Sequence, residues 1–320
     1  MRVVVSGVNG FVGGHLAREL EGHGHDVIGL GLGEADPAIE PLLADYIADD
    51  LTVAWPDVPC DAVVHLAALS AVGPSFDDPQ GFISANSAPL THLCEGLLRR
   101  SARCRVVVVS TGAVYAPGLR LSEKAPTEPT SPYAVSKLLV ELQSAYYRRR
   151  GLDVVVMRPF NHIGPGQGSG FLLPDLLAGV EAARATGRPL RVGNLDTRRD
   201  YTDVRDVARA YRLAAEALDL DAPLLNVCSG ESVSGRALLE LVAAAMGVEV
   251  PPLEVDASRL RPGDPESISG DNTRIREVLG WTPQIDLATT VSDVVGHVRR
   301  DAGGLGDGTG GSVQSRAHQR

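Results

Sequence analysis

The stretch Arg2–Gly13, with the sequence RVVVSGVNGFVG, decides the fold. Its three consecutive valines are typical of a strand that is buried on both faces. Gly7, Gly10 and Gly13 follow in the pattern GxxGxxG, and a helical pattern then continues to about Glu21. A buried strand, a glycine-rich turn and a helix in this order predict the first unit of a parallel α/β fold.

The same alternation of strand and helix continues over the first two thirds of the chain. It predicts a Rossmann fold, with a doubly wound parallel sheet and helices on both faces. The further strands are expected at Asp26–Leu30, Tyr46–Ala48, Ala62–Leu66, Arg105–Ser110 and Asp153–Arg158, and the long helices at Gln80–Arg100 and Pro132–Arg150.

The second part of the chain is less regular and suits a smaller α/β substrate-binding domain. We expect a dinucleotide-binding domain over residues 1–160 and a substrate-binding region over 161–300 that interleaves with the sheet. Residues 301–320 are rich in glycine and poor in apolar side chains, so we expect a disordered tail. Helices are expected near Leu172–Thr186, Asp203–Leu218, Ser234–Met246, Thr273–Leu279 and Leu287–Arg299.

Composition limits the classes of partner. The 320 residues carry a formal net charge of −10, which argues against nucleic acid or an anionic membrane as the main partner. No secretory signal and no apolar run long enough to cross a bilayer is visible. The four cysteines form no CxxC pair, so we expect reduced thiols, a cytoplasmic protein and no metal site.

The glycine pattern is suited to hold a dinucleotide. Gly7 permits the tight turn, Gly10 lets backbone N–H groups approach a pyrophosphate, and Gly13 allows the helix to pack closely on the strand. Phe11 and Val12 lie at the helix start, where the helix dipole attracts the anion. The alternative is a purely structural turn.

The choice between NAD and NADP is less clear. Gly31 stands at the end of the second strand, where an acid for the ribose hydroxyls is usual, and no arginine is near to bind a 2′-phosphate. The missing cation favours NAD, with NADP possible, and Glu34 could reach the ribose. Asp50 is a candidate acceptor for the adenine amino group, or else it caps a loop.

A redox centre is indicated by Tyr133 and Lys137, in the pattern YxxxK on a predicted helix. A spacing of four places both side chains on one helix face. An ammonium group there should lower the pKa of the phenol, so that Tyr133 can exchange a proton with a sugar oxygen while a nicotinamide exchanges hydride. A hydroxyl at the end of the fifth strand should complete the centre, with Thr111 preferred over Ser110.

These motifs, together with His65–Ala68 (HLAA), resemble those of the extended short-chain dehydrogenases/reductases. Contacts of Leu66, Ala67 and Ala68 with the cofactor are implied by this resemblance. Residues 158–167 (RPFNHIGPGQ) and 199–206 (RDYTDVRD) are more similar to GDP-6-deoxy-4-keto-mannose reductases and their dehydratase relatives.

The same resemblance implies a nucleotide-diphosphate sugar, GDP-linked, as substrate. Asn161 would contact it near the diphosphate, Arg199 would pair with the phosphates, and Arg261 and Asp264 would hold the nucleotide and its ribose. Val192 and Asn194 belong to a further matching segment. Arginine forks suit phosphates and carboxylates suit ribose hydroxyls. His162 is an additional polar group without an assigned role.

Ala113 departs from the family pattern. Relatives that dehydrate carry glutamate at this position, and relatives that epimerise at C3 and C5 carry cysteine. The methyl group of alanine can neither donate nor accept a proton, so dehydration and epimerisation at C3 and C5 are disfavoured and two reactions remain. One is the reduction of a 4-keto-6-deoxyhexose, and the other is 4-epimerisation by an enzyme that retains NAD. A non-catalytic dinucleotide-binding regulator is a third hypothesis, against which Tyr133 and Lys137 argue.

The resemblance also implies a homodimer. The family tends to associate through the two long helices of the dinucleotide-binding half, here Gln80–Arg100 and Pro132–Arg150. Two copies would then form a four-helix contact.

Overall fold

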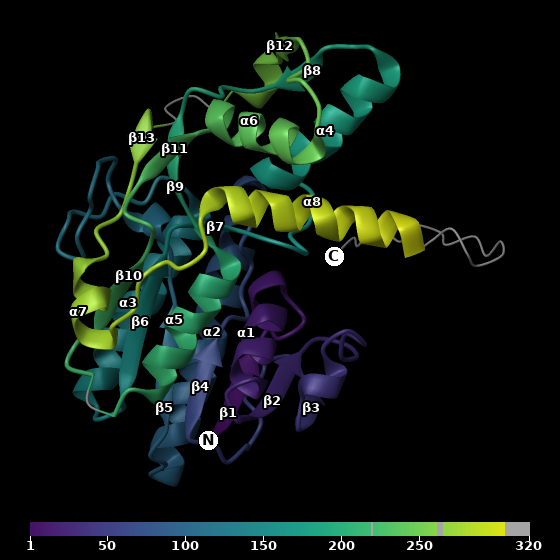
Figure 1. Cartoon of the computed structure of the whole chain (residues 1–320). Helices are drawn as coiled ribbons and strands as arrows, with labels where there is room; N and C mark the ends of the chain where they lie inside the picture. Colours follow the sequence, from purple (N-terminus) through teal and green to yellow (C-terminus); the bar gives the residue numbers. More distant parts are fainter. Residues whose placement is uncertain (219, 261–264, 305–320) are drawn as a thin grey trace.

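The structure is a computed structural model that describes residues 1–218, 220–260 and 265–304, with side chains up to residue 300. Its main layer is a seven-stranded sheet with the order β10-β6-β5-β4-β1-β2-β3, in which all neighbours are parallel (Figure 1). The order reverses beside β1, as in a Rossmann fold, which confirms the predicted fold class. The strands are β1 (Arg2–Ser6), β2 (Asp26–Gly31), β3 (Asp45–Ala48), β4 (Ala62–His65), β5 (Arg105–Val109), β6 (Val154–Pro159) and β10 (Leu224–Val227).

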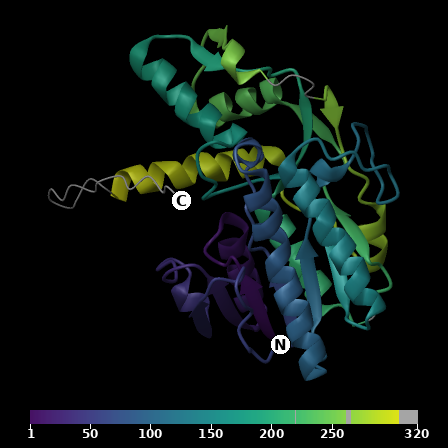
Figure 2. The same cartoon turned by 180° about the vertical axis from the view of Figure 1, so that it is seen from behind.

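Valine dominates the centre of this sheet because helices cover both faces. Val4 pairs with Ile28 on one side and Val63 on the other, and none of the three is more than 4% exposed. One face carries α1, α5 and α7, and the other carries α2 and α3 (Figures 1 and 2). These helices are α1 (Phe11–Glu21), α2 (Pro79–Arg100), α3 (Pro132–Arg149), α5 (Val204–Glu216) and α7 (Thr273–Leu279).

A smaller layer packs over the carboxyl ends of the strands. Its core lies between α4 (Leu172–Thr186), α6 (Gly235–Met246) and α8 (Leu287–Gly304). The strand β9 lies at the centre of a second sheet and pairs with β7, β11 and β13, whereas β8 pairs with β12. The short strands are β7 (Asn161–Ile163), β8 (Leu190–Val192), β9 (Arg198–Asp203), β11 (Ser232–Ser234), β12 (Leu253–Val255) and β13 (Ser267–Ile268).

Three features differ from the sequence expectation. The short strands of the smaller layer had not been predicted. The seventh strand of the main sheet, β10, comes from the second part of the chain, and its four residues had not been predicted as a strand. The last helix continues to Gly304, five residues beyond the predicted end at Arg299. The rest of the expected disordered tail, residues 305–320, lies outside the described residues. The described residues also form four 3-10 turns, η1 (Glu40–Leu42), η2 (Gly73–Phe76), η3 (Gly112–Val114) and η4 (Ala257–Arg259).

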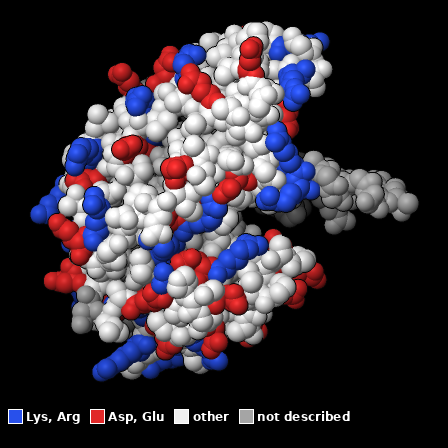
Figure 3. All heavy atoms as spheres, viewed as in Figure 1, with Lys and Arg blue, Asp and Glu red and all other residues white. Residues whose placement is uncertain are grey.

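Charges of both signs are interspersed over the face shown in Figure 3. None of the helices within the described ranges is long and apolar enough to cross a membrane.

Candidate active site

The glycine turn after β1 has no room for side chains. Gly7 adopts a φ of +72°, which favours glycine, and a Cβ there would lie 2.9 Å from the Ala67 backbone. A Cβ on Gly13 would meet the backbone oxygens of Gly7 and Val8, the latter at 2.5 Å. The three segments therefore touch through their backbones, which is the arrangement that lets a dinucleotide approach the turn.

The start of α1 is open to an anion. Gly10 is the N-cap residue, and no side chain caps the helix there. The amides of the first turn, which include those of Phe11 and Val12, have no partners within the helix and lie at the positive end of its dipole. The residues present therefore fit the pyrophosphate of a dinucleotide.

Residues 66–68 lie beside this turn because Ser6 ties them to β1. The Ser6 hydroxyl accepts a hydrogen bond from the Ala67 amide at 3.2 Å and lies 2.7 Å from His65 Nδ1. Burial and the nearby Lys137 lower the pKa of His65 to about 3, so its ring is neutral at physiological pH. The structure thus brings Ala67 against Gly7, and contact of residues 66–68 with the cofactor stays a prediction.

An uncharged side chain, that of Tyr46, lies beside Gly31, where the adenosine ribose is expected to bind. A Cβ on Gly31 would lie 2.7 Å from the Tyr46 hydroxyl, so Tyr46 takes the space of a side chain at position 31. The hydroxyl donates to Gly33 O at 3.1 Å and accepts from Asn9 Nδ2 at 3.0 Å. Asn9 Nδ2 also donates to the backbone oxygen of Glu34, whose side chain is exposed.

Asp50 caps a turn. Its Oδ1 accepts from the Thr52 amide at 2.9 Å and from the Thr52 hydroxyl at 2.6 Å. These bonds lower the pKa of the exposed carboxyl group. The geometry matches the loop-capping alternative, while contact with adenine remains a prediction.

The helix α3 presents the YxxxK pair. Ser131 caps its start by accepting from the Ala134 amide at 3.1 Å, and Pro132 occupies the first turn. Tyr133 and Lys137 follow one turn apart and are 9% and 6% exposed. Lys137 Nζ donates to Val109 O, at the end of β5, over 2.9 Å.

The hydroxyls at the end of β5 have different partners. Thr111 hydrogen-bonds the Tyr133 phenol and also accepts from the Ala113 amide at 3.2 Å. The Ser110 hydroxyl is buried and donates instead to Glu141 on α3. Thr111, rather than Ser110, therefore lies beside Tyr133.

The expected lowering of the Tyr133 pKa by Lys137 is wrong for this structure. Burial raises the pKa of Tyr133, and only the Thr111 hydrogen bond lowers it. The buried ammonium is engaged by Val109, and burial lowers the pKa of Lys137 to about 8. The phenol is therefore protonated at physiological pH.

A buried ion pair behind this centre was not recognised in the sequence. Glu141 pairs with Arg158 of β6, whose Nε lies 2.7 Å from Glu141 Oε1. The Arg158 guanidinium also lies 4.6 Å from the centre of the Tyr115 ring. Tyr133, Lys137 and Glu141 are spaced by four residues each, so a third polar residue on the same helix face was the available signal.

The strand β7 brings the substrate-side motif to the cofactor turn. Asn161 is exposed, and the next residue, His162, stacks on the Phe11 ring at 6.2 Å between centroids. His162 Nδ1 lies 3.1 Å from the Phe160 oxygen, and burial lowers the pKa of the ring. His162 is thus neutral and packs at the start of α1.

The remaining predicted substrate contacts are dispersed. Val192 is buried in the core of the smaller layer, and its backbone oxygen accepts from Asp256, so its side chain is not available to a ligand. Asn194 is exposed, and its Oδ1 accepts from the Asp196 amide at 2.9 Å.

Arg199 of β9 is half-buried and donates to Pro265 O at 2.9 Å. The two other predicted contacts, Arg261 and Asp264, lie outside the described residues. The next residue, Asp200, has a structural role, because its buried carboxylate accepts from the amides of Ser229, Gly230 and Gly270.

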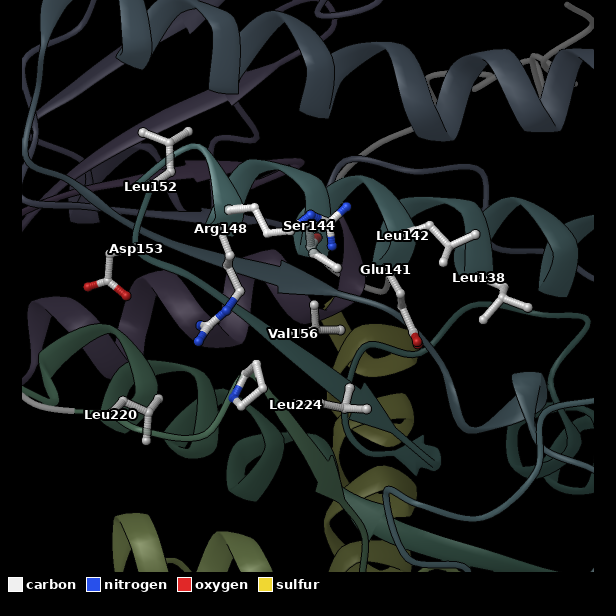
Figure 4. Close-up of a pocket in the computed structure, with 13 residues that line it drawn as sticks. Leu138, Glu141, Leu142, Ser144, Arg148, Leu152, Asp153, Val156, Leu220 and Leu224 are labelled. Atoms are coloured by element: carbon white, nitrogen blue, oxygen red, sulfur yellow. The ribbon is translucent and has the colours of Figure 1, made fainter.

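A groove of about 660 Å³ lies away from this centre, between α3 and the β6–β10 edge (Figure 4). Leu138, Leu142 and Leu224 line it, together with Glu141 and Arg148. Tyr133, Lys137 and Thr111 are not among its lining residues, so it is separate from the redox centre.

Comparison with known proteins agrees with this geometry. Residues 3–228 match the model of the NAD dependent epimerase/dehydratase family. The chain is 33% identical to a GDP-6-deoxy-D-mannose reductase of Pseudomonas aeruginosa, over 94% of this chain and 99% of the relative. It is also 33% identical to a UDP-glucose 4-epimerase of Mycolicibacterium smegmatis, over 93% and 99%. The solved structure of RMD from Pseudomonas aeruginosa complexed with NADPH has a TM-score of 0.77, with 30% identity and coverage of 93% of this chain and 100% of that one.

Proposed function

The chain belongs to the NAD dependent epimerase/dehydratase family, and from this premise we propose that it reduces a nucleotide-linked 4-keto-6-deoxyhexose at C4. Its relatives make it an NAD(P)-dependent enzyme that modifies nucleotide sugars. The specific reaction is our proposal. The observation that carries it is the neutral, buried Tyr133 phenol, hydrogen-bonded to Thr111 and one helical turn from Lys137.

The bound dinucleotide supplies the hydride. Tyr133 donates its proton to the C4 oxygen as this oxygen gains negative charge, so the phenol must be protonated when the sugar binds. The raised pKa of Tyr133 meets this requirement. Thr111 orients the sugar oxygen. We propose that the Lys137 ammonium, which Val109 holds and which does not lower the Tyr133 pKa in the protein alone, stabilises the phenolate once dinucleotide and sugar are bound.

Ala113 limits what else the site can do. It lies in η3, between Thr111 and Tyr115, and its exposed methyl group offers no acid or base. Dehydration and epimerisation at C3 and C5 both need a proton to be moved at a second carbon atom, which Ala113 cannot do. Chemistry at C4 alone needs only the three residues already described.

A second candidate is 4-epimerisation with a retained NAD. The identity to the UDP-glucose 4-epimerase supports it as strongly as the identity to the reductase supports reduction. Epimerisation begins with removal of a proton from the sugar hydroxyl, so Tyr133 must first act as a base. The raised pKa of Tyr133 is less suited to this step, and we therefore rank reduction first.

We propose GDP as the nucleotide and a phosphate-binding role for Arg199. The segment from Asn161 to Gln167 supports GDP by its resemblance to the reductases. Arg199 lies on β9, which pairs with the strand that carries Asn161 in register with Tyr201. One guanidinium and one amide on neighbouring strands suit a diphosphate and the sugar next to it.

For the cofactor we propose NAD in preference to NADP. The space beside Gly31 holds the neutral hydroxyl of Tyr46, fixed by Asn9, and the sequence has no arginine or lysine at the end of β2 to balance a 2′-phosphate. The solved relative with bound NADPH makes NADP the alternative to be tested.

Two assays separate the candidates. The purified protein is first denatured, and the released dinucleotide is identified by mass spectrometry. An empty site, with NADH consumed when a GDP-linked 4-keto-6-deoxyhexose is added, supports reduction. Stoichiometric NAD, with interconversion of UDP-glucose and UDP-galactose in the absence of added dinucleotide, would replace reduction by epimerisation. Parallel titrations with NADH and NADPH compare the two cofactors.

We also propose a homodimer formed through α2 and α3. The outer side of α3 exposes three large apolar or aromatic side chains, Val135, Leu142 and Tyr146, which are 43%, 64% and 47% exposed. Light scattering at micromolar protein should give twice the chain mass, and the mass of one chain would refute the proposal.

A further inference from the structure

Two cysteines meet at the amino end of the main sheet. Cys60 lies two residues before β4 and Cys104 lies directly before β5. Their Sγ atoms are 3.3 Å apart, although the residues are separated by 44 positions in the sequence. Both are free thiols, so this is a reduced pair in contact.

The sheet itself enforces the contact. β4 and β5 are parallel neighbours, with Ala62 opposite Arg105. The Arg105 amide donates to Asp61 O at 3.0 Å, which holds the two entering segments together. The two thiols therefore lie in segments that lead directly into two paired strands, and this pairing fixes the segments beside each other.

One sulfur is accessible and the other is not. Cys60 is partly exposed, whereas Cys104 is 6% exposed. A cavity of about 140 Å³ borders Cys60 and is also lined by Pro59, Leu97 and Arg100. This cavity offers a small polar oxidant a route to the first sulfur of the pair.

The surroundings also make Cys60 the better nucleophile. The hydrogen bond with Cys104 is the main cause that lowers the pKa of Cys60, and the charges of Arg100 and Arg2 add to it. Together they outweigh burial and the charge of Asp61, which raise this pKa. The same bond raises the pKa of Cys104. The thiolate is the reactive form of cysteine, so reaction should begin at Cys60.

We propose that Cys60 and Cys104 form a modification site that hydroperoxides oxidise to an intramolecular disulfide. The Cys60 thiolate attacks one oxygen of hydrogen peroxide and breaks the O–O bond, which gives a sulfenic acid and, with one proton, water. The Cys104 sulfur then attacks the Cys60 sulfur, and the hydroxyl leaves as the second water. Two thiols are oxidised and one peroxide is reduced, and a small dithiol can reverse the reaction.

Geometry favours the second step. A disulfide has an S–S length of about 2.05 Å, so the sulfurs must approach by little more than 1 Å from their 3.3 Å separation. The site lies at the opposite end of the sheet from Thr111 and Tyr133, because all seven strands are parallel. It is therefore a site distinct from the proposed redox centre.

The remaining two cysteines serve as internal controls. Cys94 and Cys228 are fully buried, and burial raises the pKa of Cys94 to about 12 and raises that of Cys228 well above its usual value. Neither should react with peroxide in the folded protein.

The test uses the full, reduced chain. It is treated with a small excess of hydrogen peroxide, denatured, alkylated with iodoacetamide and analysed by mass spectrometry. We expect a mass loss of 2 Da before alkylation, two alkylated cysteines instead of four, and one cross-linked peptide pair that contains residues 60 and 104. A dithiol should restore four alkylatable thiols.

Variants locate the reaction. Cys104→Ser should stop at a sulfenic acid on Cys60, trapped by dimedone, and Cys94→Ser should behave as the unchanged chain. Four intact thiols after peroxide would refute the proposal, as would a cross-link between two chains or irreversible oxidation of Cys60 without a link. The peptide map of the unchanged chain decides the matter even if a variant fails to fold.

Discussion

We propose that the two halves of the molecule bind their anionic ligands in different ways. The dinucleotide half offers backbone, in the form of the Gly7–Gly13 turn and the start of α1, within one short stretch of sequence. In our proposal the substrate half binds through side chains on separate strands, Asn161 on β7 and Arg199 on β9. A site made of contiguous backbone can be recognised from a local pattern, whereas a site made of dispersed side chains can be recognised only through resemblance.

The largest effect on activity is expected at Tyr133, the proposed proton donor. Tyr133→Phe removes the proton donor and leaves the ring packing in place. We expect turnover to fall by roughly 10²–10⁴-fold, the usual contribution of a general acid, while the affinities for dinucleotide and sugar stay nearly unchanged. Steady-state kinetics and a dinucleotide titration measure both. Unchanged turnover would refute both proposed activities, reduction and 4-epimerisation.

The dinucleotide half is tested by Gly13→Ala. The added Cβ meets the Gly7 and Val8 backbone, which cannot move aside as a flexible side chain would. Overpacking of this kind costs about 1–3 kcal/mol, so both the affinity for dinucleotide and the melting temperature should fall. Gly24→Ala is not a matched control, because Gly24 has a positive φ. Gly73→Ala is suitable, since a Cβ there meets nothing within 4 Å, and it should change neither quantity.

The substrate half is tested by Arg199→Ala against Arg198→Ala. The two residues are neighbours on β9 and point to opposite faces, and Arg198 donates to Ser232 O at 2.6 Å. If Arg199 binds the diphosphate, kcat/KM should fall by roughly tenfold through KM, which is about 1.4 kcal/mol. Arg198→Ala should have a smaller effect. Equal effects would indicate a structural role for both.

The smallest effect is expected from pH, through the charge of Lys137 in the proposed redox centre. Burial lowers the pKa of Lys137 to about 8, so the ammonium is present below this value and lost as the pH rises through it. We expect kcat/KM for reduction to fall to about half near pH 8 and to decrease further above it. His65 does not contribute, since its pKa is about 3. A flat profile from pH 7 to 9 would show that the Lys137 charge is not needed.

The comparison also explains what could be predicted from sequence. Valine runs and the glycine pattern predicted six strands of the sheet and the cofactor turn, because these depend on local periodicity and on conformations that few residues adopt. The seventh strand, β10, was missed although β3 and β4 are equally short, because it lies in the second part of the chain, where strands and helices do not alternate regularly. The helical spacing marks Glu141 as a third polar residue on the face of Tyr133 and Lys137, but its partner Arg158 is set by the packing of α3 on β6, which the local sequence does not specify.

The position of Tyr46 beside Gly31 shows the same limit in the cofactor half. Gly31 could be read as the absence of an acid, but not as the space for a tyrosine from the next strand. Likewise, Val192 belongs to a segment similar to one in relatives, and only the fold shows that its side chain lies in the core.

The late arrival of β10 has a consequence for the synthesis of the protein on the ribosome. The strand β6 ends at Pro159, but its outer partner ends at Val227, and β6 is an unpaired edge strand of the main sheet until that point has been translated. At about 5–20 residues per second, the 68 intervening residues take roughly 3–14 seconds. During this interval a nascent chain exposes the backbone groups and valines of β6 to any other strand nearby. A ribosome-bound chain stalled before Leu224 should therefore bind holding chaperones. A chain stalled after β10 should bind them less, because β6 is then paired.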